Sequence, residues 1–421
     1  MVRLIINRKD KKSKTKKQGN FSPFKALMAL CYLWINRGVN KILPKLGITK
    51  RAQGLSPREL ALATMVQSLV GSKSEQETAQ RIGSKTSRSN ALQKQLNRFH
   101  NNPKNHFEKL LPTTAQYLLP TKSSEIMVLD DTPIEKSGKR MKWAGKFFNT
   151  AERYYYHGYE LVVLALARRR TALPLNFIPK RSQTKKRRPK KTRQSPSKLN
   201  LGLRLIKEAL AQGLRPRYLA FDSWYFALWF IKCLERLGLS WVTKARCNRI
   251  FIYQGRKIKA SRFIEITKGH GRCPLKFIVE LPKYGLVSVV VNYRSRRYEV
   301  LVTNDLSLEA TAIVRIFKKR WKIETLFREA KQHYGLEKFH NRKWAAIIAH
   351  FALSLLAQFL VRFFSTFKDK FLMVVDQLLK KTFVRVKKEV NIVFDKWKVA
   401  FDEIFNYFKI SKELKICLIS V

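Results

Sequence analysis

The chain has 421 residues, of which 45% are hydrophobic. This content excludes a globally disordered chain and leaves room for two or three domains with buried cores. Its 86 Lys and Arg outnumber 29 Asp and Glu, which gives a formal net charge of +57. A polyanion partner would relieve such self-repulsion, so nucleic acid is the first candidate partner and an anionic membrane surface the second. The five cysteines are scattered without a CxxC pair, which argues against a zinc finger and fits a reducing cytoplasm.

The N-terminal part is basic and then helical. Residues 1–20 carry eight Lys and Arg and one Asp, which predicts a basic arm that is disordered until it meets DNA. Residues 21–120 predict an all-α DNA-binding domain. Ser56 and Pro57 form a favourable helix start, with Ser as the cap and Pro in the first turn. Helices over 57–70 and 75–82 would form either a helix-turn-helix or a plain helical bundle, and both readings stay open.

After residue 120 the pattern becomes mixed α/β. Apolar runs that predict strands, two of them ending in an acidic residue, occupy 125–130, 159–167, 173–178, 217–222 and 240–245. Helices are expected over 199–212 and 224–237. Between the strand at 173–178 and the first of these helices, residues 180–193 hold nine Lys and Arg and no acid, so this segment is either a solvated loop or a contact to phosphates.

The last third of the chain changes character twice. Residues 247–304 are β-rich and predict a small antiparallel insertion, and 306–334 predict one long helix. The apolar stretch 345–364 is long enough to resemble a membrane span. It contains His350, Gln358 and Arg362, so we expect a buried helix and no membrane. Residues 346–421 are expected to form a helical C-terminal region.

Acidic residues stand out in so basic a chain. Asp130, Asp131 and Asp222 close two apolar strands, and a buried carboxylate needs a partner, either Lys or Arg or a divalent cation. Two-metal phosphodiester chemistry needs about three carboxylates. Glu324 is the best third candidate, although its spacing from Arg320 also fits an ordinary ion pair on a helix surface.

A spaced motif around this glutamate resembles a known family. Phe317, Arg320, Glu324 and Lys331 follow the intervals of the Tyr-Arg-Glu-Lys signature of insertion-sequence-4 type transposases, with Phe in place of Tyr. The segment 129–132 (LDDT) resembles the first-Asp segment of that family, and 220–226 (AFDSWYF) resembles the second. A β-rich insertion lies between the second Asp and the Glu, as in the family. The resemblance covers roughly residues 121–345.

The resemblance implies a fold and a chemistry. It implies an α/β RNase H-like catalytic domain over 121–345, with a mixed sheet and a β-rich insertion at about 247–304. It also implies an Asp-Asp-Glu (DDE) transposase that cleaves and transfers strands by phosphodiester hydrolysis and transesterification. Asp130, Asp222 and Glu324 would hold two Mg²⁺ or Mn²⁺ ions, with Asp131 as the alternative to Asp130.

The same resemblance implies partners. Arg320 and Lys331 would contact phosphates of double-stranded DNA, both at transposon ends and at the target, and the basic segment adds four candidate contacts: Lys185, Lys186, Arg187 and Arg188. A homodimer assembled on DNA and a cytoplasmic, nucleoid-associated place in a prokaryote are further expectations. Two alternatives remain, an RNase H-like nuclease or resolvase and a catalytically inactive DNA-binding relative.

Several other residues are of types that can take part in catalysis, but we assign them structural or DNA-contact roles. The run 154–156 of three tyrosines is interpreted as strand aromatics and not as recombinase nucleophiles. His157, His333 and His340 are assigned structural or DNA-contact roles, since oxygen ligands suit Mg²⁺ better than imidazole does. Trp321 is expected to pack in the core, with stacking on a displaced base as the alternative.

Overall fold

A computed structural model gives the fold. It describes residues 26–366 apart from 27–28, 31–32, 35–37, 49–55, 68–85, 103, 120–125, 139, 150–151, 169–170, 182–195, 271–272 and 295–296. Several predictions fall outside the described residues: the basic arm, the second helix of the helix-turn-helix alternative, the four basic residues 185–188, and everything after residue 366.

The N-terminal part is helical, as expected. Its elements are η1 (Val39–Lys41), α2 (Ile42–Lys45), α3 (Pro57–Gln67), α5 (Thr86–Asn101), η2 (Phe107–Lys109) and α6 (Leu110–Leu118). The predicted start of α3 is confirmed as a reciprocal capping box. The Ser56 amide donates to the Glu59 carboxylate at 2.6 Å, and the Glu59 amide donates to the Ser56 hydroxyl at 3.3 Å.

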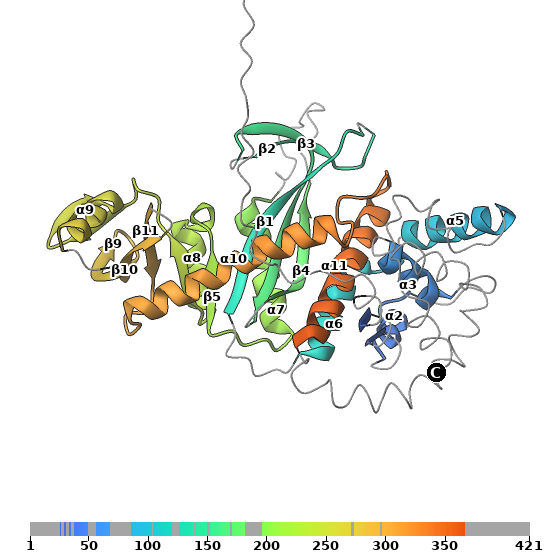
Figure 1. Ribbon diagram of the computed structural model, residues 1–421, viewed down its shortest axis with the longest axis horizontal. Helices are drawn as coiled ribbons and strands as arrows, with labels where there is room; N and C mark the ends of the chain where they lie inside the picture. Colours follow the sequence, from blue (N-terminus) through green and yellow to red (C-terminus); the bar gives the residue numbers. More distant parts are fainter. Residues whose placement is uncertain are drawn as a thin grey trace, which may run out of the picture.

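The centre of the molecule is a large mixed sheet (Figure 1). Its core strands are β1 (Ile126–Glu135), β3 (Tyr154–Ala167), β4 (Ala172–Lys180), β5 (Tyr218–Phe221) and β6 (Ser240–Lys244). In space they run β4-β3-β1-β5-β6. β1 and β4 pair antiparallel with β3, whereas β5 runs parallel to both β1 and β6. This order, with α7 (Lys198–Ala211) and α8 (Leu228–Arg236) linking the later strands, confirms the RNase H-like α/β fold.

Two core strands are longer than the sequence pattern predicts. β1 continues five residues past Asp130, so Asp130 and Asp131 lie inside the strand and the prediction that they close it is wrong. The ladder continues because β3 pairs with β1 as far as Glu135, opposite Gly158. β3 itself begins at Tyr154 and pairs with β2 (Gly145–Asn149), a strand that was not expected. The three tyrosines are therefore strand residues, as interpreted.

The insertion is β-rich but does not stand apart. It contains β7 (Ile250–Tyr253), β8 (Arg256–Lys259), α9 (Ala260–His270), β9 (Leu275–Leu281), β10 (Gly285–Arg294) and β11 (Arg297–Thr303). β11 pairs antiparallel with β6, so these strands extend the central sheet. The predicted antiparallel, β-rich insertion is thus present and continuous with the central sheet, whereas α9 and β8 were not expected.

Two long helices complete the fold. α10 (Ala310–Gln332) lies across the sheet, and α11 (Trp344–Thr366) lies between the sheet and the N-terminal helices (Figure 1). α11 packs against β4, α3, α5 and α6. Among the described residues it is the one helix long and apolar enough to cross a membrane, yet 78% of its apolar window is buried inside the protein. This burial is what a core helix of the fold requires.

Candidate active site

Asp130 and Asp222 are brought together by the parallel pairing of β1 and β5. Leu129 pairs with Phe221 in that ladder, and each acid is the next residue of its strand or of the segment that follows it. Asp222 keeps an extended backbone and lies at the N-cap position of the short helix η3 (Ser223–Tyr225), without a side-chain capping bond. Side chains at equivalent positions of paired strands share a face of the sheet. The fold therefore places both carboxylates side by side.

The third candidate, Glu324, reaches this pair through Arg320. The Arg320 guanidinium donates to Asp130 Oδ2 at 2.8 Å and to Glu324 Oε1 at 2.5 Å. Arg320 is nearly buried, with 11% of its side chain exposed, so these ion pairs are shielded from water. The sequence alternative, an ion pair on an exposed helix surface, is wrong in this respect: Arg320 points into the site and joins α10 to β1.

Charge is concentrated at this point. Burial raises the pKa of Asp130 from 3.8 to about 7, Arg320 opposes the shift, and the nearby Asp131 and Asp222 add to it. Burial alone would lower the pKa of Arg320, but Asp130, Glu324 and Asp222 together raise it. All three carboxylates therefore act electrostatically on the same guanidinium, which binds Asp130 and Glu324 directly.

The chemistry of this cluster suits a hard divalent cation. Its donors are carboxylate oxygens, which are the ligands that Mg²⁺ prefers. Within the described part of the chain, no group of three or more His, Cys, Asp and Glu side chains could hold a metal ion as placed. In this arrangement Arg320 forms ion pairs with both Asp130 and Glu324. Its own Nε is buried without a hydrogen-bond partner among the described residues.

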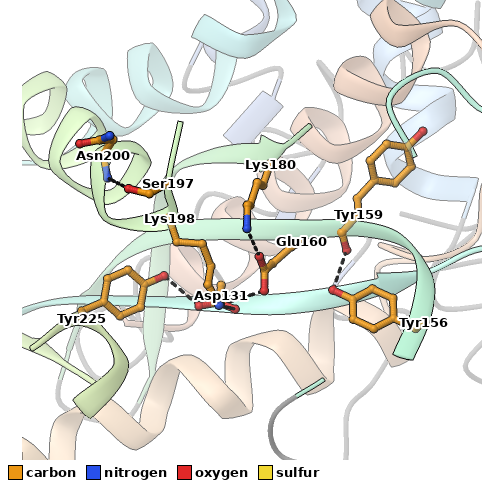
Figure 2. Close-up of polar contacts among 9 residues, drawn as sticks. All are labelled: Asp131, Tyr156, Tyr159, Glu160, Lys180, Ser197, Lys198, Asn200 and Tyr225. Atoms are coloured by element: carbon orange, nitrogen blue, oxygen red, sulfur yellow. Dashed lines mark hydrogen bonds and ion pairs between the residues drawn. The ribbon is translucent and has the colours of Figure 1, made fainter. Parts of the chain in front are cut away.

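Asp131 faces the other side of β1 and belongs to a different cluster (Figure 2). Lys198, the first residue of α7, donates to Asp131 at 3.1 Å and to Glu160 at 2.9 Å. Tyr225 donates its hydroxyl to Asp131 at 2.9 Å, and Lys180 donates to Glu160 at 3.3 Å. Asp131 is thus neutralised within the protein and points away from Glu324, which favours Asp130 as the first acid.

Arg320 and Lys331, which were predicted to contact phosphates, both bind groups of the protein itself. Lys331 donates to the carbonyl of Pro133 at 2.7 Å and pairs with Glu337 at 2.8 Å. It therefore ties α10 to β1 and to the segment after the helix. Phe317, which replaces the family's Tyr, is buried, and its ring centroid lies 5.6 Å from the Arg320 guanidinium.

Trp321 was expected to pack in the core, and this expectation is wrong. Half of its side chain, 50%, is exposed. The helical rotation explains the difference: Arg320 and Glu324 turn toward β1, and Trp321 follows Arg320 by about 100°, so it leaves the packed face. His157 Nδ1 donates a hydrogen bond to the Lys136 carbonyl oxygen at 3.0 Å, consistent with a structural role.

The sequence analysis missed three residues near the acids: Lys198, Glu160 and Tyr225. Glu160 carried a signal, because it is the single charged residue in the otherwise apolar and aromatic run YELVVLALA of β3. A buried acid in such a strand needs a buried cation. Lys198 carried no signal, since a lysine at the start of a helix is ordinary.

Fold and site together define the class. An RNase H-like sheet with paired acids on neighbouring parallel strands, and a glutamate on the helix after the insertion, is the framework of an RNase H-like nuclease. The chain belongs to the DDE superfamily endonuclease family, whose model matches residues 51–293, more than half of its length. Asp130 and Asp222 lie within the matched residues and Glu324 lies beyond them.

Comparison with individual proteins adds little. No curated protein matches this chain. Among solved structures, the Drosophila P element transposase strand transfer complex aligns with 76% of this chain and 69% of its own, at 11% identity and a TM-score of 0.21. A likeness this weak carries no argument about fold or function.

Proposed function

We propose that this chain is the DNA transposase of an insertion sequence of the insertion-sequence-4 type. It would bind transposon ends, cleave them in a metal-dependent reaction and join them to a target. One observation carries the proposal: Arg320 joins Asp130 to Glu324 by two ion pairs, and the pairing of β1 with β5 places Asp222 next to Asp130. Membership of the DDE endonuclease family supports phosphodiester cleavage, and the spaced motif on α10 supports transposition in particular.

The three carboxylates would form the metal-binding set. Two Mg²⁺ or Mn²⁺ ions held there would supply an activated nucleophile, first water and then a DNA 3′-hydroxyl, and would offset charge on the leaving 3′-oxygen. The rigid pairing of β1 with β5 orients Asp130 and Asp222, so these two acids need no rearrangement of the backbone. The Glu324 side chain, on α10, is 31% exposed, against 17% for Asp130.

Arg320 would have two roles. Without DNA it neutralises Asp130 and Glu324, and with DNA it would turn toward a phosphate and release their oxygens. Its buried, unpartnered Nε supports such an exchange, because an unsatisfied buried donor favours a new acceptor. Lys331 and the segment with Lys185, Lys186, Arg187 and Arg188 would add phosphate contacts at transposon ends and target DNA. A homodimer on DNA, in the cytoplasm and on the nucleoid of a prokaryote, is part of the proposal.

The test is cleavage of DNA that carries the sequences flanking the gene of this protein. Wild-type protein with Mg²⁺ should produce strand cuts with 3′-hydroxyl ends and join them to a plasmid target. Glu324→Gln should abolish cleavage and leave binding to the ends nearly intact, because it removes one ligand charge and keeps size and helix propensity. Arg320→Ala should weaken binding and cleavage together.

Glu329→Gln is the matched control. It makes the same chemical change on the same helix, but Glu329 pairs with Arg362 of α11 and does not contact Asp130 or Arg320. This variant should still cleave. Cleavage at the wild-type rate by Glu324→Gln would overturn the assignment of the site. Cleavage without joining would instead indicate the nuclease or resolvase alternative.

A further inference from the structure

The hairpin of β2 and the first part of β3 has an aromatic outer surface. It projects beyond the rest of the sheet (Figure 1). Phe148 and Tyr155 form a cross-strand pair with ring centroids 4.9 Å apart, and they are 44% and 64% exposed. The Lys146 ammonium lies 4.3 Å from the centroid of the Tyr155 ring. These three side chains are called the hairpin patch below.

The opposite face of the same hairpin is packed. Phe147 stacks on Tyr156 at 5.8 Å, and Tyr156 is 5% exposed. Lys180, which binds Glu160, lies 5.6 Å from the centroid of the Phe147 ring. The hairpin thus has its structural aromatics on one side. The patch on the other side is exposed, so packing within the fold does not account for its aromatic side chains.

The patch lies on the face of the sheet that carries Asp130. Asp130 pairs with Val163 of β3, and alternate residues of a strand share a face, which places Tyr155 with Asp130. The packed side agrees with this assignment, because Lys180 links Phe147 to Glu160, which shares the Lys198 cluster with Asp131. Eight residues separate Val163 from Tyr155, about 26 Å along an extended strand.

The positive charge around the hairpin patch indicates the kind of partner that it binds. Residues 136–158 contain six Lys and Arg and one acidic residue. A second copy of a chain with a net charge of +57 would be repelled, whereas DNA would be attracted. Aromatic rings stack on bases whose faces are open, which are those of unpaired strands. A cation beside the rings suits the phosphate between two such bases.

We propose that the hairpin patch binds an unpaired DNA strand, with Phe148 and Tyr155 stacking on bases and Lys146 at a phosphate. The inference extends the proposed function, because the hairpin lies about 26 Å along β3 from the acids that would cut a strand. It can nevertheless be tested alone, since binding of single strands requires neither Mg²⁺ nor cleavage.

The experiment measures binding of the full chain to a labelled oligo-dT strand and to a blunt duplex of equal length, without Mg²⁺, by fluorescence anisotropy. The double variant Phe148→Leu/Tyr155→Leu keeps an apolar hairpin and removes both rings. Its affinity for the single strand should fall at least about tenfold, whereas its affinity for the duplex should change less than about twofold. Tyr293→Leu, on β10 and 51% exposed, is the matched control and should leave both affinities unchanged.

Equal affinities of the double variant and the wild-type protein for the single strand would overturn the proposal. So would an equal loss for both DNAs, because that would indicate general damage. A change in sedimentation from dimer to monomer with unaltered single-strand binding would assign the patch to a protein interface instead. Failure of the wild-type protein to cleave transposon ends would count against the proposed function. It would not alter the conclusion drawn from single-strand binding.

Discussion

Replacing Lys198 by Met should destabilise the protein strongly, because this residue holds two acids on the back of β1. Its side chain is 10% exposed and contacts Asp131 and Glu160, which are 16% and 9% exposed. Breaking a buried ion pair by removing one partner costs about 3–5 kcal/mol. Lys180 still contacts Glu160 at 3.3 Å, so one acid keeps a counter-charge and we expect a loss near about 3 kcal/mol.

The control for this variant lies on the same helix. Arg204 pairs with Glu208 at 2.7 Å, but its side chain is 67% exposed. Arg204→Met should therefore cost no more than about 1 kcal/mol. Urea unfolding followed by circular dichroism measures both variants, and in thermal unfolding about 3 kcal/mol corresponds to roughly 6–12 °C for a domain of this size.

The pH dependence provides a second measurement on Lys198→Met. Burial already raises the pKa of Asp131, and removing Lys198 takes away the largest opposing influence. The destabilisation should accordingly shrink as the pH falls and Asp131 becomes neutral. If Lys198→Met and Arg204→Met unfold at the same urea concentration at neutral pH, the account of the cluster in Figure 2 is wrong.

Three further predictions concern the capping box, a glycine and the raised pKa of Asp130. Ser56→Ala should cost about 1 kcal/mol in urea unfolding, since it removes the side-chain cap of α3. Gly158→Ala should cost about 3 kcal/mol or more, because a Cβ there would lie 2.0 Å from the Ile134 carbonyl oxygen at a φ of +155°. With its pKa raised from 3.8 to about 7, Asp130 binds a proton in the folded protein that the unfolded chain has released. Stability without metal should therefore fall as the pH rises from about 4 to about 7, and Asp130→Asn should remove that dependence.

The core of the fold could be predicted because the residues within each strand or helix carry the pattern that identifies it. Apolar runs located β1, β5 and β6, and the helical spacing located α7 and α10 to within a few residues. The end of β1 could not be predicted in this way. Asp130, Asp131 and Pro133 are poor strand formers, and only the ladder with β3 carries the strand through them.

The candidate site was only partly predictable, for a related reason. Asp222 ends a strand, as its sequence indicates, and the motif around Glu324 identified its helix. The bond between Arg320 and Asp130 joins residues 190 positions apart, and no periodicity within either segment reveals it. The same is true of Lys198 and Asp131, 67 positions apart. Such pairs depend on how the helices cross the sheet.

The crossing of α10 over β1 bears on whether Arg320 can leave Asp130. Arg320 and Lys331 are 11 residues apart on one helix face, about 16 Å, and both bind β1. Lys331 is attached to the Pro133 carbonyl and to Glu337, neither of which belongs to the acidic cluster. Removing Arg320 from Asp130 would thus leave α10 fastened to β1 at the other contact. Glu324 lies between the two attachments. It would therefore keep its position relative to β1 while Arg320 exchanged the Asp130 carboxylate for another anion.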